Sequence, residues 1–230
     1  MKYKIKKITC LLLCFILSFS LVGCRDKKAE KRYRDYVKSL IAINYLGATD
    51  DYVKATGANQ EDADALYQAN VELLADNILA YYGITLSNAS TMRQGYVDLA
   101  KNIYSKVNYK VSNAYKDGTA YLVDVTIYPI DIFAQTSEEV NAYITQFNEA
   151  VANGDYNDYT MEQYETEFST GLLEILNTAC LNMTYAAEKV VTVEIIIDDN
   201  VYYISDKDFL AIDEAIINSA VSTNITVGPQ

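Results

Sequence analysis

The hydrophobic period of this chain changes near residue 108, and this change restricts the possible folds more than any other feature. Before it, apolar side chains recur three and four residues apart over residues 33–43, 71–82 and 96–107, which is the spacing of amphipathic helices. After it, apolar and polar residues alternate over residues 109–113 and 121–127, as they do in half-buried strands. We therefore expect three helices first and strands after them.

Two β-hairpins are predicted from the alternating segments. In the first, residues 109–113 pair with residues 121–127 through a turn at Lys116-Asp117-Gly118, and Pro129 ends the ladder because proline has no amide hydrogen to donate. In the second, residues 191–197 turn at Asp198-Asp199-Asn200 and return over residues 201–204. The two hairpins predict one antiparallel sheet of about four strands.

Two helices are expected between the hairpins. The segments 136–139 and 160–163 fit capping boxes with Thr136 and Thr160 at the N-cap positions. Gly154 ends the first of these helices, and an apolar stripe continues the second as far as residue 186.

A last helix, capped by Ser205 or Asp206, follows the second hairpin. The sequence thus predicts an α+β fold, in which a sheet of about four antiparallel strands packs with five to six helices and the N-terminal part is helical.

The first residues resemble a secretory signal peptide. Residues 1–7 carry four lysines and no acid, and residues 8–22 are almost wholly apolar. This run of 15 residues is shorter than the roughly 20 that a permanent membrane-spanning helix needs. A short membrane anchor or a buried N-terminal helix is the alternative interpretation.

The apolar run ends in Leu21-Val22-Gly23-Cys24, which resembles the lipobox of bacterial lipoproteins. The resemblance implies that the Cys24 thiol receives a diacylglyceryl group, that the chain is cut before Cys24, and that the new amino group is acylated in many bacteria. Stable anchoring generally takes two lipid chains, and a diacylglyceryl group supplies both. The alternative is a cysteine that occupies this place by chance.

The resemblance divides the chain into four parts. They are a lipoprotein signal peptide at residues 1–23, a basic membrane-proximal tether with the start of the first helix at 24–38, a single acidic α+β domain at 39–221, and a frayed tail at 222–230. We expect the mature protein to be anchored in the cell membrane and to face away from the cytoplasm.

The body also resembles a group of uncharacterised lipoproteins of Gram-positive bacteria. The resemblance lies in Tyr109-Lys110-Val111, in Tyr121-Leu122-Val123-Asp124-Val125, and in Val201-Tyr202-Tyr203-Ile204 before Asp206. It implies a Gram-positive source, but that group has no established activity to carry over.

Basic and acidic residues are concentrated in different segments of the chain. Residues 25–38 hold seven Lys/Arg and three Asp/Glu, whereas the chain from residue 39 onward holds eight Lys/Arg and 28 Asp/Glu. The basic segment suits anionic lipid headgroups, and the acidic body lacks the clustered cations that nucleic-acid binding needs. The acid excess indicates either a cationic ligand or simply a soluble surface.

The chemistry available to the mature chain is limited. The sequence contains no histidine, which excludes His-based acid–base catalysis and His-ligated metal sites. Of the four cysteines, Cys10 and Cys14 leave with the signal peptide and Cys24 is lipidated. Cys180 is then the one remaining thiol, and its place beside an apolar stripe predicts that it is buried.

Two candidate sites are weak. Residues 153–158 place oxygen donors at alternate positions, as a calcium-binding EF-hand loop does, but Asp158 stands where the glycine is required and Tyr164 where the closing Glu is required. The acid pairs Glu138/Glu139 and Glu165/Glu167 would suit glycoside hydrolysis only if two carboxylates flanked one cleft. We therefore predict no catalytic, metal-binding or cofactor-binding residue.

The 21 tyrosines, with adjacent pairs at 81–82 and 202–203, are either core residues that replace the absent Trp or exposed contacts for glycans or a protein. The sequence favours the core. For function we expect a non-enzymatic surface lipoprotein that binds a cell-wall polymer, an envelope protein or a small ligand, with an Asp/Glu-dependent cell-envelope hydrolase as the alternative.

Overall fold

The structure is a computed structural model, and it describes residues 26–84, 90–198 and 201–218. The expected signal peptide, the residues Leu21, Val22, Gly23 and Cys24, and the expected tail at 222–230 lie outside the described residues, as do two residues of the second hairpin turn.

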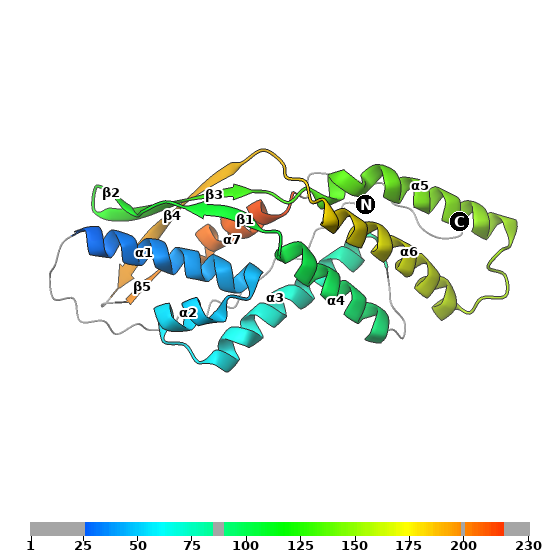
Figure 1. Cartoon of the computed structure of the whole chain (residues 1–230), viewed down its shortest axis with the longest axis horizontal. Coiled ribbons are helices and arrows are strands. Elements are labelled where there is room, and N and C mark those ends of the chain that lie inside the picture. The colour runs from blue at the N-terminus through cyan, green and yellow to red at the C-terminus, as the bar shows by residue number, and fades with distance from the viewer. Residues whose placement is uncertain (1–25, 85–89, 199–200, 219–230) are drawn as a thin grey trace.

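Seven α-helices and five β-strands make up the described part of the chain (Figure 1). In order they are α1 (Asp26–Ile41), a π-helical turn η1 (Ala42–Leu46), α2 (Thr49–Thr56), α3 (Gln60–Tyr81), α4 (Ser90–Tyr104), β1 (Asn108–Val111), β2 (Tyr115–Asp117), β3 (Ala120–Tyr128), α5 (Ile132–Asn153), α6 (Met161–Leu181), β4 (Lys189–Asp198), β5 (Val201–Tyr203) and α7 (Asp206–Ile216). The predicted α+β class and the helical N-terminal part are confirmed. Helix α2 was not predicted.

The strands form one curled antiparallel sheet in the order β1-β3-β4-β5, and β2 also pairs with β3. The first predicted hairpin is present, but its outer arm is interrupted between β1 and β2. There the amide of Ser112 still donates to Asp124 at 2.9 Å, whereas the amide of Ala114 donates to the carbonyl of Glu30 in α1 at 3.4 Å. The interruption therefore ties the sheet edge to the first helix.

One face of the sheet forms part of the core. Val123, Val125 and Ile127 of β3 and Val193 and Ile195 of β4 are buried, and α1 and α7 cover them (Figure 1). On the opposite face the β4 side chains are exposed, except for the half-buried Ile196. This alternation is the period of 2 that the sequence displays.

The helices α3 to α6 form the other half of the molecule, and the α5–α6 pair extends away from the sheet (Figure 1). The capping box at Thr160 is confirmed: its side chain accepts from the amide of Gln163 at 3.2 Å. The capping box at Thr136 is wrong, because α5 begins four residues earlier with the buried Ile132. Thr136 instead donates to the Ile132 carbonyl at 2.7 Å, a bond that threonine makes readily inside a helix.

Helix α6 ends five residues before the predicted position 186. The backbone leaves the helix because Gln135 of α5 accepts hydrogen bonds from both the amide and the hydroxyl of Thr184, each at 3.0 Å. Tyr185 then bridges to Ile130. A contact between two helices thus ends an apolar stripe that would otherwise continue.

Many tyrosines are core residues, as predicted. Those below a tenth exposed are Tyr33, Tyr36, Tyr45, Tyr52, Tyr82, Tyr96, Tyr104 and Tyr202. Several meet edge to face, for example Tyr45 with Tyr104 at 5.3 Å between ring centroids. Such pairs contribute about 0.5–1.5 kcal/mol beyond the burial of their area.

One carboxylate in this fold has a pH-dependent effect on stability. Asp213 of α7 accepts a hydrogen bond from the Tyr45 hydroxyl at 2.9 Å. Burial raises the pKa of this carboxyl, and the Tyr45 hydrogen bond opposes the rise in part. In the unfolded chain Asp213 has the usual pKa of an aspartate, about 3.9. Because the pKa is higher in the folded state, the free energy of unfolding falls as the pH rises from the unfolded pKa through the folded one.

We expect Asp213→Asn to raise the free energy of unfolding at neutral pH, because asparagine needs no ionisation and can still accept from Tyr45. At about pH 3 the two proteins should be almost equally stable, since Asp213 is then protonated in both states. Urea unfolding at the two pH values measures the difference. An equal change at both would contradict the prediction.

Candidate functional site

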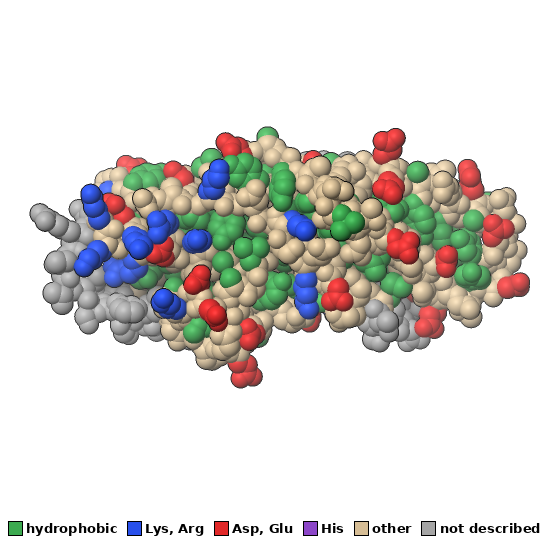
Figure 2. Space-filling view, in the orientation of Figure 1, with side chains coloured by type: hydrophobic (Ala, Val, Ile, Leu, Met, Phe, Trp, Pro, Cys, Tyr) green, Lys and Arg blue, Asp and Glu red, His purple; other side chains and the backbone are tan. Residues whose placement is uncertain are grey.

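Basic side chains gather at one end of the molecule, and the opposite end, formed by α5 and α6, carries acidic side chains and no basic ones. Helix α1 carries six Lys/Arg and three Asp/Glu, whereas residues 132–181, which span α5 and α6, carry nine Asp/Glu and no Lys/Arg. Figure 2 shows the basic side chains gathered at the α1 end and acidic ones along the α5–α6 end. The segment predicted as a basic tether is helical from Asp26 onward and packs on the sheet through Tyr33, Tyr36 and Val37.

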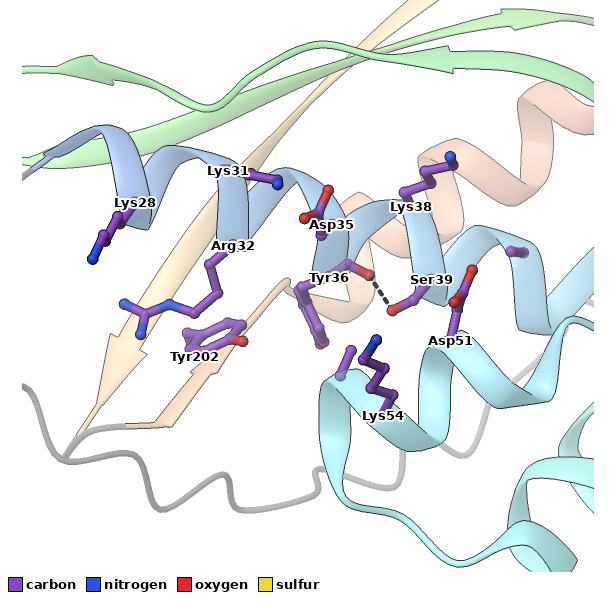
Figure 3. Close-up of a pocket in the computed structure, with 12 residues that line it drawn as sticks. Lys28, Lys31, Arg32, Asp35, Tyr36, Lys38, Ser39, Asp51, Lys54 and Tyr202 are labelled. Atoms are coloured by element: carbon purple, nitrogen blue, oxygen red, sulfur yellow. Dashed lines mark hydrogen bonds between the residues drawn. The ribbon is translucent and has the colours of Figure 1, made fainter.

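The most distinctive site on this basic end is a hollow of about 500 Å³ between α1, α2 and β5 (Figure 3). We call it the α1–α2 hollow. Its lining is mostly cationic and aromatic: Lys28, Lys31, Arg32, Asp35, Tyr36, Lys38, Ser39, Ala42, Asp51, Lys54, Ala55 and Tyr202.

Aromatic rings form one wall of the α1–α2 hollow. Tyr36 and Tyr202 are both 7 % exposed and meet edge to face with centroids 5.2 Å apart. The guanidinium carbon of Arg32 lies 5.6 Å from the ring centroids of both Tyr33 and Tyr202, within the range of a cation–π contact. Burial raises the pKa of Tyr202, and the charge of Arg32 partly opposes this rise.

The cations of the hollow are not neutralised by neighbouring acids. Among the described residues, no carboxylate lies within 4.0 Å of the charged groups of the four lining lysines or of Arg32. The carboxylate of Asp35 is instead bound by Arg34 at 2.6 Å. The Nε of Arg32 is buried and has no hydrogen-bond partner in the described part of the chain.

A second hollow, of about 600 Å³, lies on the other side of α1 against β1 and shares Asp35 and Lys38 with the first. Here Arg34 also donates to the side chain of Asn113 at 3.0 Å, and the Tyr109 hydroxyl donates to the Lys38 carbonyl at 3.4 Å. Burial and the charge of Asp51 raise the pKa of Tyr109 to about 12. Lys110 in turn donates to the Tyr128 hydroxyl at 3.0 Å. Most polar side chains of the second hollow are thus already hydrogen-bonded or ion-paired, which leaves the α1–α2 hollow as the better candidate site.

The candidates singled out from the sequence lie elsewhere. Glu138 and Glu139 are exposed on α5, and Glu165 and Glu167 lie on α6; neither pair lines the two hollows. Residues 153–158 form the end of α5 and the turn before α6, and within the described ranges no three Cys, Asp or Glu side chains gather as a metal ion would require.

Sequence reasoning missed the α1–α2 hollow, because its walls come from residues 28–55 and from Tyr202. The one signal was the excess of Lys and Arg over residues 25–38. That excess pointed to a surface for anions but not to a concave site.

Cys180 is buried at 1 % exposure, as predicted. Burial raises the pKa of its thiol to about 11, although the charge of Lys106 opposes the rise.

Since the thiolate is the reactive form, we expect Cys180 in the native protein to react with a thiol reagent at pH 8 at least about a hundredfold more slowly than in urea. Absorbance on release of thionitrobenzoate from the chain from residue 25 onward, whose one cysteine is Cys180, measures both rates, and similar rates would contradict the prediction.

None of the helices in the described ranges has the length and apolar character needed to cross a bilayer.

Comparison with known proteins gives a likeness in fold. No protein-family model matches the sequence, and no curated protein matches it either. The chain is similar in structure to a crystallised bacterial protein of the lipoprotein class. That protein is described as "a putative lipoprotein (ycdA) from Bacillus subtilis subsp. subtilis str. 168"; the TM-score is 0.55 at 20 % sequence identity over 84 % of this chain. The match covers 60 % of the ycdA chain, so the likeness concerns the fold of that part.

Proposed function

We propose that this chain is an extracytoplasmic lipoprotein, held to the cell membrane of a Gram-positive bacterium by a diacylglyceryl group on Cys24. The observation that carries the proposal is the distance along the chain between the lipobox and the folded body. Cys24 stands two residues before Asp26, where α1 begins. Cleavage before Cys24 would therefore leave every described helix and strand attached to the lipid by a very short link.

The division of charge supports one orientation of the body. The anchor would lie at the basic end, where Lys27, Lys28 and Lys31 of α1 are exposed. Each basic residue near an anionic leaflet contributes about 1 kcal/mol. The acidic α5–α6 pair would be repelled from the same leaflet and would extend away from it.

We further propose that the body is a non-enzymatic binding module for a cell-wall polymer or an envelope protein. Its support is the position of the acidic side chains. The pairs Glu138/Glu139 and Glu165/Glu167 lie on α5 and α6 and line neither hollow. Of the two carboxylates that line the α1–α2 hollow, Asp35 and Asp51, the first is ion-paired with Arg34 at 2.6 Å. An Asp/Glu hydrolase needs two carboxylates across one cleft. Release of soluble sugar from wall glycans that a single Glu→Gln change abolished would overturn this part of the proposal.

Metabolic labelling tests the anchor. Cells that express the chain are fed a fatty acid bearing an alkyne, and the membrane fraction is analysed for label and for the mass of the N-terminal peptide. We expect label in the membrane fraction and an N-terminal peptide that begins at Cys24 with a diacylglyceryl mass added. An unmodified peptide that begins before Cys24 would overturn the anchor.

A further inference from the structure

We propose that the α1–α2 hollow binds an anion that carries a phosphate group, held by Arg32 and by lysines of α1 and α2. The inference goes beyond the proposed anchor and does not depend on it, because every lining residue lies in the folded body.

The charge of the lining selects an anion. Five cationic side chains, Lys28, Lys31, Arg32, Lys38 and Lys54, face two carboxylates, Asp35 and Asp51. Asp35 is already paired with Arg34, so the hollow retains a clear excess of positive charge. This excess stands out in a chain whose residues from 39 onward hold 28 acids and eight bases. A concave site with charge of one sign concentrates ligands of the other sign.

The groups on the two walls suit a phosphate. Figure 3 shows Arg32 reaching over Tyr202 from α1 and Lys54 reaching up from α2 toward Tyr36 and Ser39. The guanidinium of Arg32 forms no ion pair with a carboxylate of the described residues, and a guanidinium can present two parallel N–H donors to a phosphate. Lysines add mobile point charges that reach the remaining oxygens. A carboxylate offers two acceptor oxygens in one plane, whereas the tetrahedral oxygens of a phosphate group can be reached from both walls.

The size and the aromatic wall suit a phosphate ester better than the bare ion. A hollow of about 500 Å³ lies within the range of about 300–1,000 Å³ found for small-molecule sites. The Tyr36 and Tyr202 rings offer apolar area for the carbon part of the ligand. Two sources share this chemistry: a free phosphate ester, and the headgroup of an anionic phospholipid near the end of α1.

The test uses the chain from residue 25 onward without lipid, which contains every described helix, strand and buried residue. One arm titrates glycerol 3-phosphate by calorimetry at low salt, with succinate as the dicarboxylate comparison. The other measures flotation with vesicles of equal parts phosphatidylglycerol and phosphatidylcholine, with pure phosphatidylcholine vesicles as the comparison.

Two variants address the hollow. Lys28→Gln with Lys54→Gln removes one exposed charge from each wall, and the matched control Lys189→Gln with Lys207→Gln removes two exposed charges from β4 and α7. We expect the first pair to weaken binding about thirtyfold and the control to weaken it less than about threefold. Arg32→Lys keeps the charge but loses the planar pair of N–H donors, so it should also weaken binding. Thermal melting checks that each variant is folded.

Saturable binding of glycerol 3-phosphate that the hollow variants weaken supports a free ester as the source. Flotation only with phosphatidylglycerol, weakened by the same variants, supports a lipid headgroup. Binding of neither probe would overturn the proposal, as would equal losses in the hollow and control variants. Succinate binding as tight as glycerol 3-phosphate would overturn the assignment of phosphate, and unchanged binding in Arg32→Lys would overturn the role of Arg32.

Discussion

Replacement of Cys24 by alanine is expected to abolish lipid incorporation and to leave an uncleaved or mislocalised precursor. In lipobox proteins the thiol of this residue accepts the diacylglyceryl group before the signal peptide is cut, and alanine has no sulfur to accept it. The loss should be complete, because a single thiol carries the reaction. Fatty-acid labelling and fractionation of cells that express the variant measure the result.

The chain provides a matched control for this experiment. Cys180→Ala removes the other cysteine that lies beyond the predicted cleavage site, and that thiol is buried in α6. We expect Cys180→Ala to be labelled as fully as the wild type. Normal labelling of Cys24→Ala, or equal losses in both variants, would show that Cys24 is not the lipidated residue.

The elements with a clear hydrophobic period could be predicted from the sequence, because their burial repeats within each element. The face of α1 that begins at Tyr33 and the alternation of Val123, Val125 and Ile127 in β3 are of this kind. Helix α2 could not be predicted in this way, since eight residues with only Tyr52 and Thr56 buried do not show a period.

Element ends were less predictable because tertiary contacts decide them. The outer arm of the first hairpin breaks where Ala114 reaches the carbonyl of Glu30, and α6 ends where Gln135 holds Thr184. At Thr136 the sequence fits a helix start, but burial of Ile132 extends α5 backward past it. Where a tertiary contact buries more surface than the local pattern would, the contact determines where the helix or strand ends.

The α1–α2 hollow could not be predicted for the same reason, because contacts between distant parts of the chain form it. Arg32 and its neighbours were interpreted as a basic tether with the start of the first helix, since the sequence alone does not say what faces them. In the structure Tyr33 of the same helix packs on Tyr121 of β3 and Tyr202 of β5, with centroids 4.9 and 5.2 Å away. This packing fixes the cations of α1 beside α2 and turns a charged segment into a concave site.

Tyr96 joins two helices in the half of the molecule away from the sheet. Its side chain is 0 % exposed in α4, and its hydroxyl donates to the carbonyl of Ser169 in α6 at 3.0 Å. Burial raises the pKa of this phenol, so the hydroxyl remains a donor at neutral pH. The residue therefore combines a large buried ring with a satisfied buried polar group.

We expect Tyr96→Ala to lower the free energy of unfolding by about 3–5 kcal/mol, because it leaves a cavity between α4 and α6 that the fixed helices cannot fill. Tyr96→Phe keeps the ring and loses only the hydrogen bond to Ser169, so it should cost about 1 kcal/mol. Tyr159→Ala is the control, since Tyr159 is 43 % exposed and its loss should cost less than about 1 kcal/mol. Urea unfolding ranks the three variants, and a cost for Tyr96→Ala no larger than that for Tyr159→Ala would show that the α4–α6 contact is not part of the stable core.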